Sequence, residues 1–146
     1  MKISTKGRYT LRVMIDLAQH NTGEFIALKD ISARQNITVK YMEQIVTVLG
    51  KAGYLLSMRG NNGGHKLAKA PSEYVVGDIL RVMEGNLAPI DCVAITNNTI
   101  CPYQEECATI SFWKGLDKVV NEYVDSYTLQ DLVDQANRNH TDDYSI

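Results

Sequence analysis

The sequence contains no long apolar segment. No stretch approaches the roughly 18 to 20 apolar residues that a membrane span requires, and the N-terminus, MKISTKGRYTLRVMIDLAQH, lacks the continuous apolar region of a secretory signal. A cytoplasmic protein without a membrane segment is therefore expected. The 146 residues, of which 45% are hydrophobic, suit one compact domain with an extension better than two full domains.

Cysteine is scarce, and all of it lies in one segment. Cys92, Cys101 and Cys107 have the spacing C-x8-C-x5-C within CVAITNNTICPYQEEC. Three is an odd number for a disulfide framework, and a reducing compartment keeps thiols free. The cysteines therefore indicate metal binding or redox chemistry rather than covalent cross-links.

The usual catalytic arrangements are also missing from the sequence. No histidine neighbours a cysteine, and neither a glycine-rich phosphate loop nor a pair of acids placed for general acid and base catalysis is found. A thiol-based enzyme would need a base and an oxyanion or substrate site near its cysteine. We therefore expect that the protein is not an enzyme.

A net charge of −2 hides a strong asymmetry along the chain. Residues 1–70 carry eleven Lys and Arg against four acids, a net charge of +7, whereas residues 71–146 carry four against thirteen, a net charge of −9. A basic half next to an acidic half indicates that the first half has a face for a polyanion. Unevenly distributed surface charge without a partner is the alternative.

Three amphipathic helices are predicted in the basic half. Ser4 or Thr5 caps the first, which ends near HNTGEF, and LKDISARQN at 28–36 forms the second. Thr38 caps the third over 39–53. Its buried stripe consists of Met42, Ile45, Val46 and Leu49. Two short helices around a tight turn predict a helix-turn-helix motif.

A hairpin is predicted directly after these helices. The apolar segments YLLSM and HKLAK flank the Asn- and Gly-rich RGNNGG, whose glycines tolerate the positive φ angles of a hairpin tip. A helix-turn-helix followed at once by a basic-flanked hairpin is more specific than either part alone. The combination predicts a winged helix.

The remaining segments are a short helix, a loop and a long helix. VGDILRVMEGN predicts a helix that ends near Gly85, and no helical period survives in the cysteine loop between Pro89 and Pro102. From Ala108 a wide apolar stripe predicts a long helix, and Thr128 caps a short last one. The stripe consists of Phe112, Trp113, Leu116, Val119, Val120, Tyr123, Val124 and Tyr127. Such a stripe indicates self-association, with packing onto the chain's own winged helix as the alternative.

The predicted fold class is therefore mainly α with a small β-hairpin. It comprises a winged helix-turn-helix DNA-binding domain over 1–85, a cysteine-containing sensor loop over 86–107, a dimerisation helix with a short C-terminal helix over 108–136, and a flexible tail over 137–146.

Several side chains of the third helix and the hairpin are suited to contact duplex DNA. Gln44 can pair with adenine, Glu43 can accept from cytosine N4, and Arg59 on a thin hairpin suits a narrow minor groove. Phosphate contacts are expected from Thr38, Lys40 and Tyr41. A solvated helix face is the alternative for any one of them.

The motifs MKISTKGRY, YMEQIV, RGNNGGHKL, VGDILRVMEG, FWKGLDKVV and TLQDLV cover nearly the whole chain. With them the sequence resembles the IscR/CymR/NsrR-type winged-helix regulators, the Rrf-two family. The resemblance implies a homodimer with an exchanged long helix that binds promoter DNA. It implies groove contacts at Thr38, Lys40, Glu43 and Gln44, and wing contacts at Arg59 and Gly60.

Two metal groups compete for the cysteine loop. The spacing is too wide for the C-x2-C knuckle of a structural zinc site, whereas an iron–sulfur cluster accepts thiolates spread over a loop. The resemblance implies a [2Fe–2S] cluster held by Cys92, Cys101 and Cys107. Family members that supply a fourth ligand do so at the positions that are Arg8 and Ile110 in this chain.

The fourth cluster ligand is therefore left open by the sequence. Candidates are Asp91, Glu105, Glu106, a histidine from elsewhere in the dimer, or a small exogenous group. A cluster held by only three protein ligands would be labile, which suits a sensor of iron–sulfur status, redox state or nitric oxide.

The leading functional hypothesis is a transcriptional regulator gated by this cluster. The alternative resembles CymR, a repressor of cysteine and sulfur metabolism that senses through a protein partner, a cysteine-biosynthesis enzyme, without a cluster. A pure protein-interaction module is a third hypothesis, and salt-dependent binding to duplex DNA would argue against it.

Overall fold

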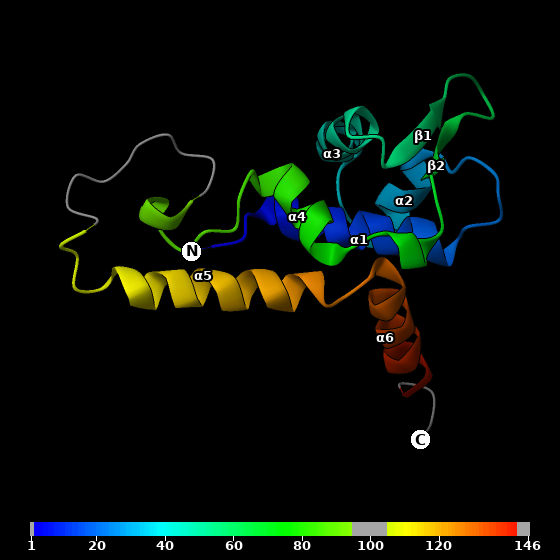
Figure 1. Ribbon diagram of the computed structural model, residues 1–146. Coiled ribbons are helices and arrows are strands. Elements are labelled where there is room, and N and C mark those ends of the chain that lie inside the picture. Colours follow the sequence, from blue (N-terminus) through cyan, green and yellow to red (C-terminus); the bar gives the residue numbers. More distant parts are fainter. Residues whose placement is uncertain (1, 95–104, 143–146) are drawn as a thin grey trace.

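The computed structural model describes residues 2–94 and 105–142, and its elements match the predicted class (Figure 1). The helices are α1 (Thr5–Gln19), α2 (Leu28–Gln35), α3 (Val39–Lys51), α4 (Val76–Glu84), α5 (Ile110–Asp125) and α6 (Leu129–Asp142). The strands are β1 (Leu55–Met58) and β2 (Gly64–Leu67), and the short 3-10 helices are η1 (Pro71–Glu73) and η2 (Asp91–Val93). The prediction of a mainly α fold with a small hairpin is confirmed.

Local hydrogen bonds explain where α1 and α3 begin, and a left-handed residue explains where α2 ends. The Ser4 hydroxyl accepts from the backbone N–H of Gly7 at 3.0 Å, and the Thr38 hydroxyl accepts from that of Tyr41 at 3.2 Å, so both predicted caps are confirmed. Asn36 lies between α2 and α3 with a left-handed backbone, φ 55°. This conformation makes the tight turn of the helix-turn-helix, since Asn tolerates it better than most residues.

The hydrophobic core is formed by α1 to α4, the wing with the segment that follows it, and the last helix. Val13, Met14 and Leu17 of α1 pack against Ile31 of α2. Other core side chains are Ile37, Met42, Ile45, Val46, Leu49, Leu55, Leu67, Tyr74, Ile79, Leu129 and Val133. The last two belong to α6, so the final helix completes the core of the first domain rather than standing apart from it.

The wing is an antiparallel hairpin attached to the core at its base. Leu55 pairs with Leu67, and both are buried, while Met58 pairs with Gly64 near the tip. A short bridge between Ile26 and His65 adds a third extended segment beside β2. These contacts give the hairpin a fixed direction relative to α2.

Helix α5 lies along the outside of the domain, next to α4 (Figure 1). Its Val120 and Val124 pack on a small second cluster of Val76, Leu80 and Leu87. Gly77 permits this contact, because a Cβ atom at its position would overlap the Asp125 carboxylate. Only one face of α5 is covered in this way.

Two boundaries differ from the sequence-based prediction. Helix α5 begins at Ile110 rather than at 108, and α6 continues to Asp142 rather than ending near residue 136. The first residues of the predicted flexible tail are therefore helical. A side-chain bond across the predicted end supports the extension, from Gln135 to Asn139 at 3.0 Å. Residues 143–146 lie outside the described residues.

A bilayer-spanning helix would have to be longer and more apolar than any of the helices in the described part of the chain.

Candidate nucleic-acid interface and cysteine loop

Helix α3 presents a polar face to solvent and an apolar face to the core. Thr38, Lys40, Glu43 and Gln44 are exposed, as predicted, while the four side chains of the predicted stripe are buried. The exposed set offers a hydroxyl, an ammonium, a carboxylate and an amide within the first turns of one helix. Such groups can donate to and accept from base edges and phosphates.

Tyr41 departs from the predicted position. It is half-buried against the core, and its ring lies edge-on to the ring of Tyr9, with 5.6 Å between the ring centroids. The sequence periodicity placed Tyr41 on the open face with its neighbours. The structure turns it towards α1, because an aromatic side chain from that helix fills the space beside it.

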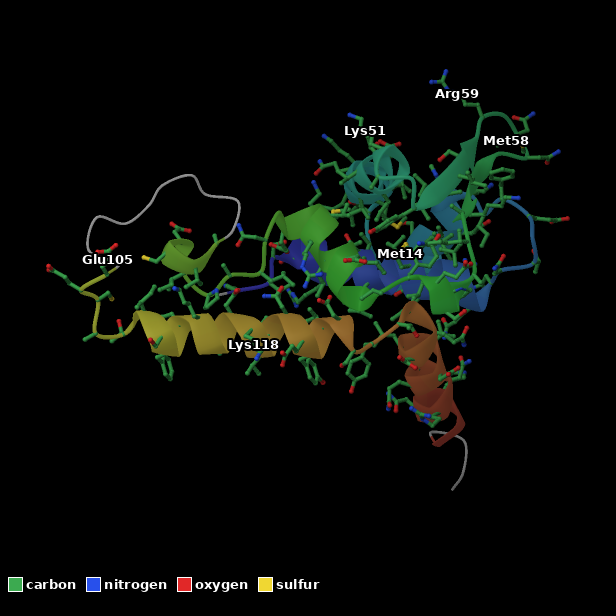
Figure 2. The ribbon with its side chains drawn as sticks, in the orientation of Figure 1. Met14, Lys51, Met58, Arg59, Glu105 and Lys118 are labelled. Atoms are coloured by element: carbon green, nitrogen blue, oxygen red, sulfur yellow. The ribbon has the colours of Figure 1, made fainter. Side chains whose placement is uncertain are left out.

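The tip of the wing carries an exposed arginine. Figure 2 shows Arg59 projecting from the hairpin away from the body of the domain. Gly60 follows it with φ 110°, a conformation that L side chains rarely adopt, so the turn depends on glycine here. A cationic side chain on a narrow, exposed hairpin has the shape and charge to enter a groove of duplex DNA.

Two exposed lysines, one at the end of α3 and one after the wing, were not singled out from the sequence. Lys51 ends α3, and Lys69 follows the wing with its ammonium 4.9 Å from the ring centroid of Tyr74. Both belong to the basic half of the chain. Their positions at the ends of predicted elements were the available signal, because phosphate contacts in such folds come from the edges of the groove-facing element as well as from its middle.

The structure places the two ends of the cysteine loop. Cys92 is exposed on η2, and Cys107 is half-buried just before α5. The predicted ligand Cys101 lies outside the described residues. Within residues 2–94 and 105–142, no three His, Cys, Asp or Glu side chains gather around a common point. The described part of the loop therefore does not by itself assemble a metal site.

The donor chemistry at the two ends nevertheless fits an iron–sulfur group, whose usual ligands are thiolates. The pKa of the Cys107 thiol lies below its ordinary value, because the Thr109 hydroxyl, 3.5 Å from the sulfur, and nearby backbone N–H groups stabilise the thiolate. Each of these two cysteines has an exposed acidic residue next to it in the sequence, Asp91 before Cys92 and Glu106 before Cys107. Glu105, labelled in Figure 2, is exposed as well.

A polar clamp connects α5 to the winged helix. Arg81 of α4 donates to both carboxylate oxygens of Asp125 at 2.8 and 2.9 Å, and to the Asn121 side chain at 2.7 Å. Helix η2, which carries Cys92, packs on α5 as well, and Val93 and Arg81 both line a cavity of about 160 Å³. Helix η2 therefore contacts α5, and α5 contacts α4.

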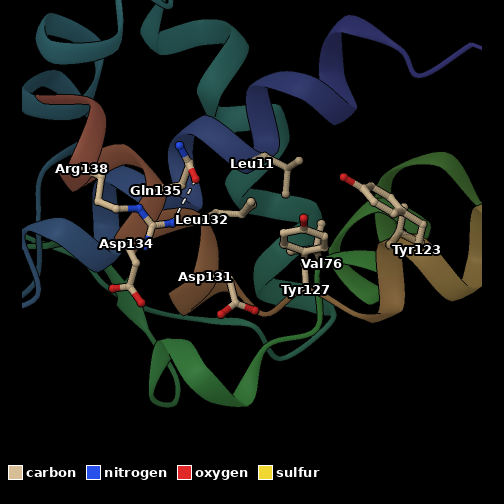
Figure 3. Close-up of a pocket in the computed structure, with 10 residues that line it drawn as sticks. Leu11, Val76, Tyr123, Tyr127, Asp131, Leu132, Asp134, Gln135 and Arg138 are labelled. Atoms are coloured by element: carbon tan, nitrogen blue, oxygen red, sulfur yellow. Dashed lines mark hydrogen bonds between the residues drawn. The ribbon is translucent and has the colours of Figure 1, made fainter. Parts of the chain in front are cut away.

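A larger cavity lies where α5 meets α6 (Figure 3). Its volume is about 440 Å³, and Leu11, Val76, Tyr123 and Tyr127 form part of its wall. The exposed side of α5 continues from this cavity, with Phe112, Val119 and Tyr123 exposed by 67%, 61% and 63%. Large apolar side chains at this exposure on one helix indicate a contact surface for another macromolecule.

Known proteins similar to this chain agree with this geometry. The profile of the family described as "Rrf2: Iron-dependent Transcriptional regulator" matches residues 3–135. Protein rrf2 of Nitratidesulfovibrio vulgaris is 37% identical over 136 residues, which are 93% of this chain and 89% of that protein. The family description and the relative CymR of Bacillus subtilis both name transcriptional regulators rather than enzymes, as expected.

Solved structures give the same result. The CymR structure, described as the global cysteine regulator of B. subtilis, has a TM-score of 0.74 at 38% identity and covers 92% of this chain and 98% of its own. The IscR structure of T. potens has a TM-score of 0.73 at 39% identity, and the match covers 93% of this chain and 88% of the IscR chain. The chain combines a winged helix, a long helix and a cysteine loop, and the similar proteins match it along nearly its whole length. It therefore belongs to the Rrf2 family of transcriptional regulators.

Proposed function

We propose that two copies of this chain bind operator DNA, with α3 in the major groove and the wing beside it. The observation that carries the proposal is the exposed polar face of α3 next to the Arg59 wing, in the half of the chain that carries +7. The proposed contact residues are Thr38, Lys40, Glu43, Gln44, Arg59 and Gly60. Tyr41 is proposed to act indirectly, through its packing against Tyr9. A regulator with this role acts in the cytoplasm, beside the chromosome.

The second copy is proposed to pack on α5. The large exposed side chains Phe112, Val119 and Tyr123 cost free energy in water, and a second α5 offers the same apolar surface. A dimer places two α3 helices at a fixed spacing, which matches two half-sites on successive turns of a duplex. Operator recognition by the dimer is thus more selective than recognition by one copy.

The cysteine loop is proposed to hold a [2Fe–2S] cluster through Cys92, Cys101 and Cys107. Support comes from the similarity to IscR, the iron dependence in the family description and the lowered pKa of Cys107. When bound, such a cluster supplies a group that oxidants and nitric oxide can alter. Its fourth ligand stays open among the exposed carboxylates of the loop and groups from outside it.

The chain's own residues give the loop a route to the DNA-binding domain. Helix η2 rests on α5, and Arg81 ties α5 to α4 through Asp125 and Asn121. A change at Cys92 or Cys107 would shift η2 or the start of α5, and the clamp would pass the shift to α4. The proposed result is a change in the spacing of the two α3 helices.

A second candidate function is favoured by the similarity to CymR. In this case the chain regulates genes of cysteine metabolism and senses through a protein partner, a cysteine-biosynthesis enzyme, without a cluster. The observation in its favour is the similarity, at 38% identity, to the CymR structure, described as a global cysteine regulator. Both candidates share the DNA-binding surface and the dimer, so they differ only in what the loop does.

DNA binding is tested with duplexes that the wild-type protein selects from a random-sequence library. Affinity measured by fluorescence anisotropy should fall steeply as salt rises, because several phosphates are neutralised. Arg59→Ala should weaken binding by about 1–3 kcal/mol if Arg59 makes a groove contact.

Lys118→Ala is the matched control, since it removes the same charge from an exposed position of α5 beside Glu122, away from both the wing and the exposed Phe112, Val119 and Tyr123 (Figure 2). Equal affinity of Arg59→Ala and wild type for the selected duplex would refute the proposed role of the wing.

The cluster is tested by anaerobic reconstitution with iron and sulfide. The expected protein is coloured, holds about two irons and two sulfides per chain, and bleaches in air. Cys92→Ala or Cys107→Ala should abolish or greatly weaken cluster retention while the helical content stays unchanged, because both residues lie outside the main core.

Two results would decide against the cluster. Colourless protein that still binds the selected duplex would favour the CymR-like function, and one equivalent of zinc without iron would leave a structural metal site.

A further inference from the structure

We propose that Arg12, supported by Asp16, is a positioning residue that holds the turn between α2 and α3 and so directs the recognition helix. The inference rests on the proposed DNA-binding function. Arg12 belongs to α1, outside the helix-turn-helix segment itself. Its guanidinium bonds to Gln35, the last residue of α2, immediately before the left-handed Asn36 that makes the turn.

Arg12 contacts Gln35 at two points. Its Nε donates to the side-chain oxygen of Gln35 at 3.3 Å, and one of its terminal nitrogens donates to the Gln35 backbone carbonyl. The carbonyls of a helix's last turn have no partner within the helix, and they form the negative end of its dipole. A cation bound there stabilises the end of α2 and fixes where the chain leaves it.

Asp16 secures the same turn from the buried side. Its side chain is only 1% exposed, and it accepts from Arg34 in a two-point pair, Nε to Oδ2 at 3.0 Å and a terminal nitrogen to Oδ1 at 2.7 Å. It also accepts from the Gln35 side chain at 2.9 Å. A buried carboxylate without such partners would be strongly destabilising, so α2 is held in one place against α1.

The chain of contacts continues to the start of α3. The Arg12 guanidinium carbon lies 5.0 Å from the centroid of the Tyr9 ring, and Tyr9 packs edge-on against Tyr41 at 5.6 Å between centroids. Tyr41 stands in the first turn of α3. Helix α1 therefore contacts both sides of the turn, the end of α2 through Arg12 and the beginning of α3 through Tyr9, whose ring Arg12 covers.

A direct phosphate contact is the competing role for an exposed arginine in a basic domain. The geometry favours positioning, because Nε and a terminal nitrogen are already bonded to Gln35 and one face of the guanidinium covers Tyr9. A lysine keeps the charge but cannot form the two-point bond or the planar stack. The Lys variant therefore separates the two roles.

The experiment compares Arg12→Lys with wild type on the selected duplex and on a scrambled duplex of equal length. We expect about a tenfold loss of affinity for the selected duplex, an unchanged affinity for the scrambled one, and an unchanged slope of log affinity against log salt. Arg8→Lys on the same helix is the control, since the Arg8 side chain donates to Thr5 and not to α2. It should bind both duplexes like wild type.

A second variant tests the proposed connection. Gln35→Ala removes the side-chain acceptor of Arg12 but keeps the backbone one, so it should cause a smaller loss than Arg12→Lys, and the double variant should lose less than the sum of the two single effects. Circular dichroism checks that each variant is folded. Asp16→Asn should also lower the melting temperature, because it removes a buried carboxylate that binds Arg34 and Gln35. A loss of affinity in that variant would therefore not separate positioning from folding.

Two outcomes would overturn the inference. One is an Arg12→Lys protein that binds the selected duplex as wild type does. The other is an Arg12→Ala protein that loses affinity equally for both duplexes and has a salt slope reduced by about one, the result of a phosphate contact. A wild-type protein that selects no sequence at all would instead refute the proposed function on which the inference rests.

Discussion

Helices α1 and α5 are almost equal in length, with 15 and 16 residues, and both are amphipathic, yet their side chains are buried to opposite extents. Six residues of α1 are buried, and α5 has none among its described residues. The apolar side chains of α1 meet α2, α4 and α6 in the same chain. Those of α5 meet one small cluster and otherwise face solvent.

The difference shows that an apolar stripe predicts burial but not the molecule that provides it. The covered face of α5 contacts Val76, Leu80 and Leu87, and its other face exposes Phe112, Val119 and Tyr123. Large apolar side chains left exposed beside a covered face are typical of a helix that has a second partner. The same physical force thus makes α1 a core element and α5 the proposed interface.

The largest expected effect concerns this interface. Val119→Glu should raise the dissociation constant of the dimer at least about a hundredfold, because a buried carboxylate without a partner costs several kcal/mol. Light scattering across a concentration series measures the change. The protein should then appear as a monomer near its chain mass of 16.3 kDa at micromolar concentration.

The control is Lys118→Glu, which introduces the same side chain at the next position. Lys118 is exposed and makes only a surface pair with Glu122 at 3.8 Å, so the dimer should persist. A Val119→Glu protein that remains dimeric would show that the second partner of α5 lies elsewhere.

A smaller effect distinguishes the two faces of α5. Gly77→Ala should destabilise the protein by about 1–3 kcal/mol, since the added methyl group would overlap Asp125 in the packed contact between α4 and α5. Gly115→Ala should be less destabilising than Gly77→Ala, because Ala favours a helix over Gly by about 0.5–1 kcal/mol and an added Cβ meets no atom of the same chain within 4 Å. Urea unfolding at a fixed protein concentration measures both, and an equal or greater loss for Gly115→Ala would contradict the proposed contrast.

The smallest effect concerns the wing. Burial lowers the pKa of His65 below its ordinary value of 6.5, so the unfolded chain takes up this proton more readily than the folded one. The stability difference between wild type and His65→Gln should therefore be constant above pH 6.5 and shift against wild type as the pH falls below it. NMR titration gives the His65 pKa directly, and a value above 6.5 would contradict the prediction.

Much of the fold was predictable because its signals are local. The caps at Ser4 and Thr38, the stripe of α3 and the glycine-rich hairpin each depend on a few neighbouring residues, and the structure confirms them. The exposed set of α3 followed from the same period. Family membership was predictable too, because its motifs extend over the whole chain.

Other features depend on contacts between distant residues. Asp16 counted in the sequence only as an acidic residue, but its spacing from Val13 was a signal of burial, and its partners Arg34 and Gln35 lie on another helix. Tyr41 had the period of an exposed residue, and Tyr9 decided otherwise.

The sequence by itself thus determined the helices, the wing, the charge asymmetry and the family, since backbone preferences and apolar periods act over a few residues. Only the tertiary structure decided that α6 joins the main core through Leu129 and Val133, that Arg81 binds α5, and that Arg12 holds the end of α2. These depend on where a side chain from one helix meets a polar or apolar group of another. Periodicity places a residue on a face, but packing decides what that face contacts.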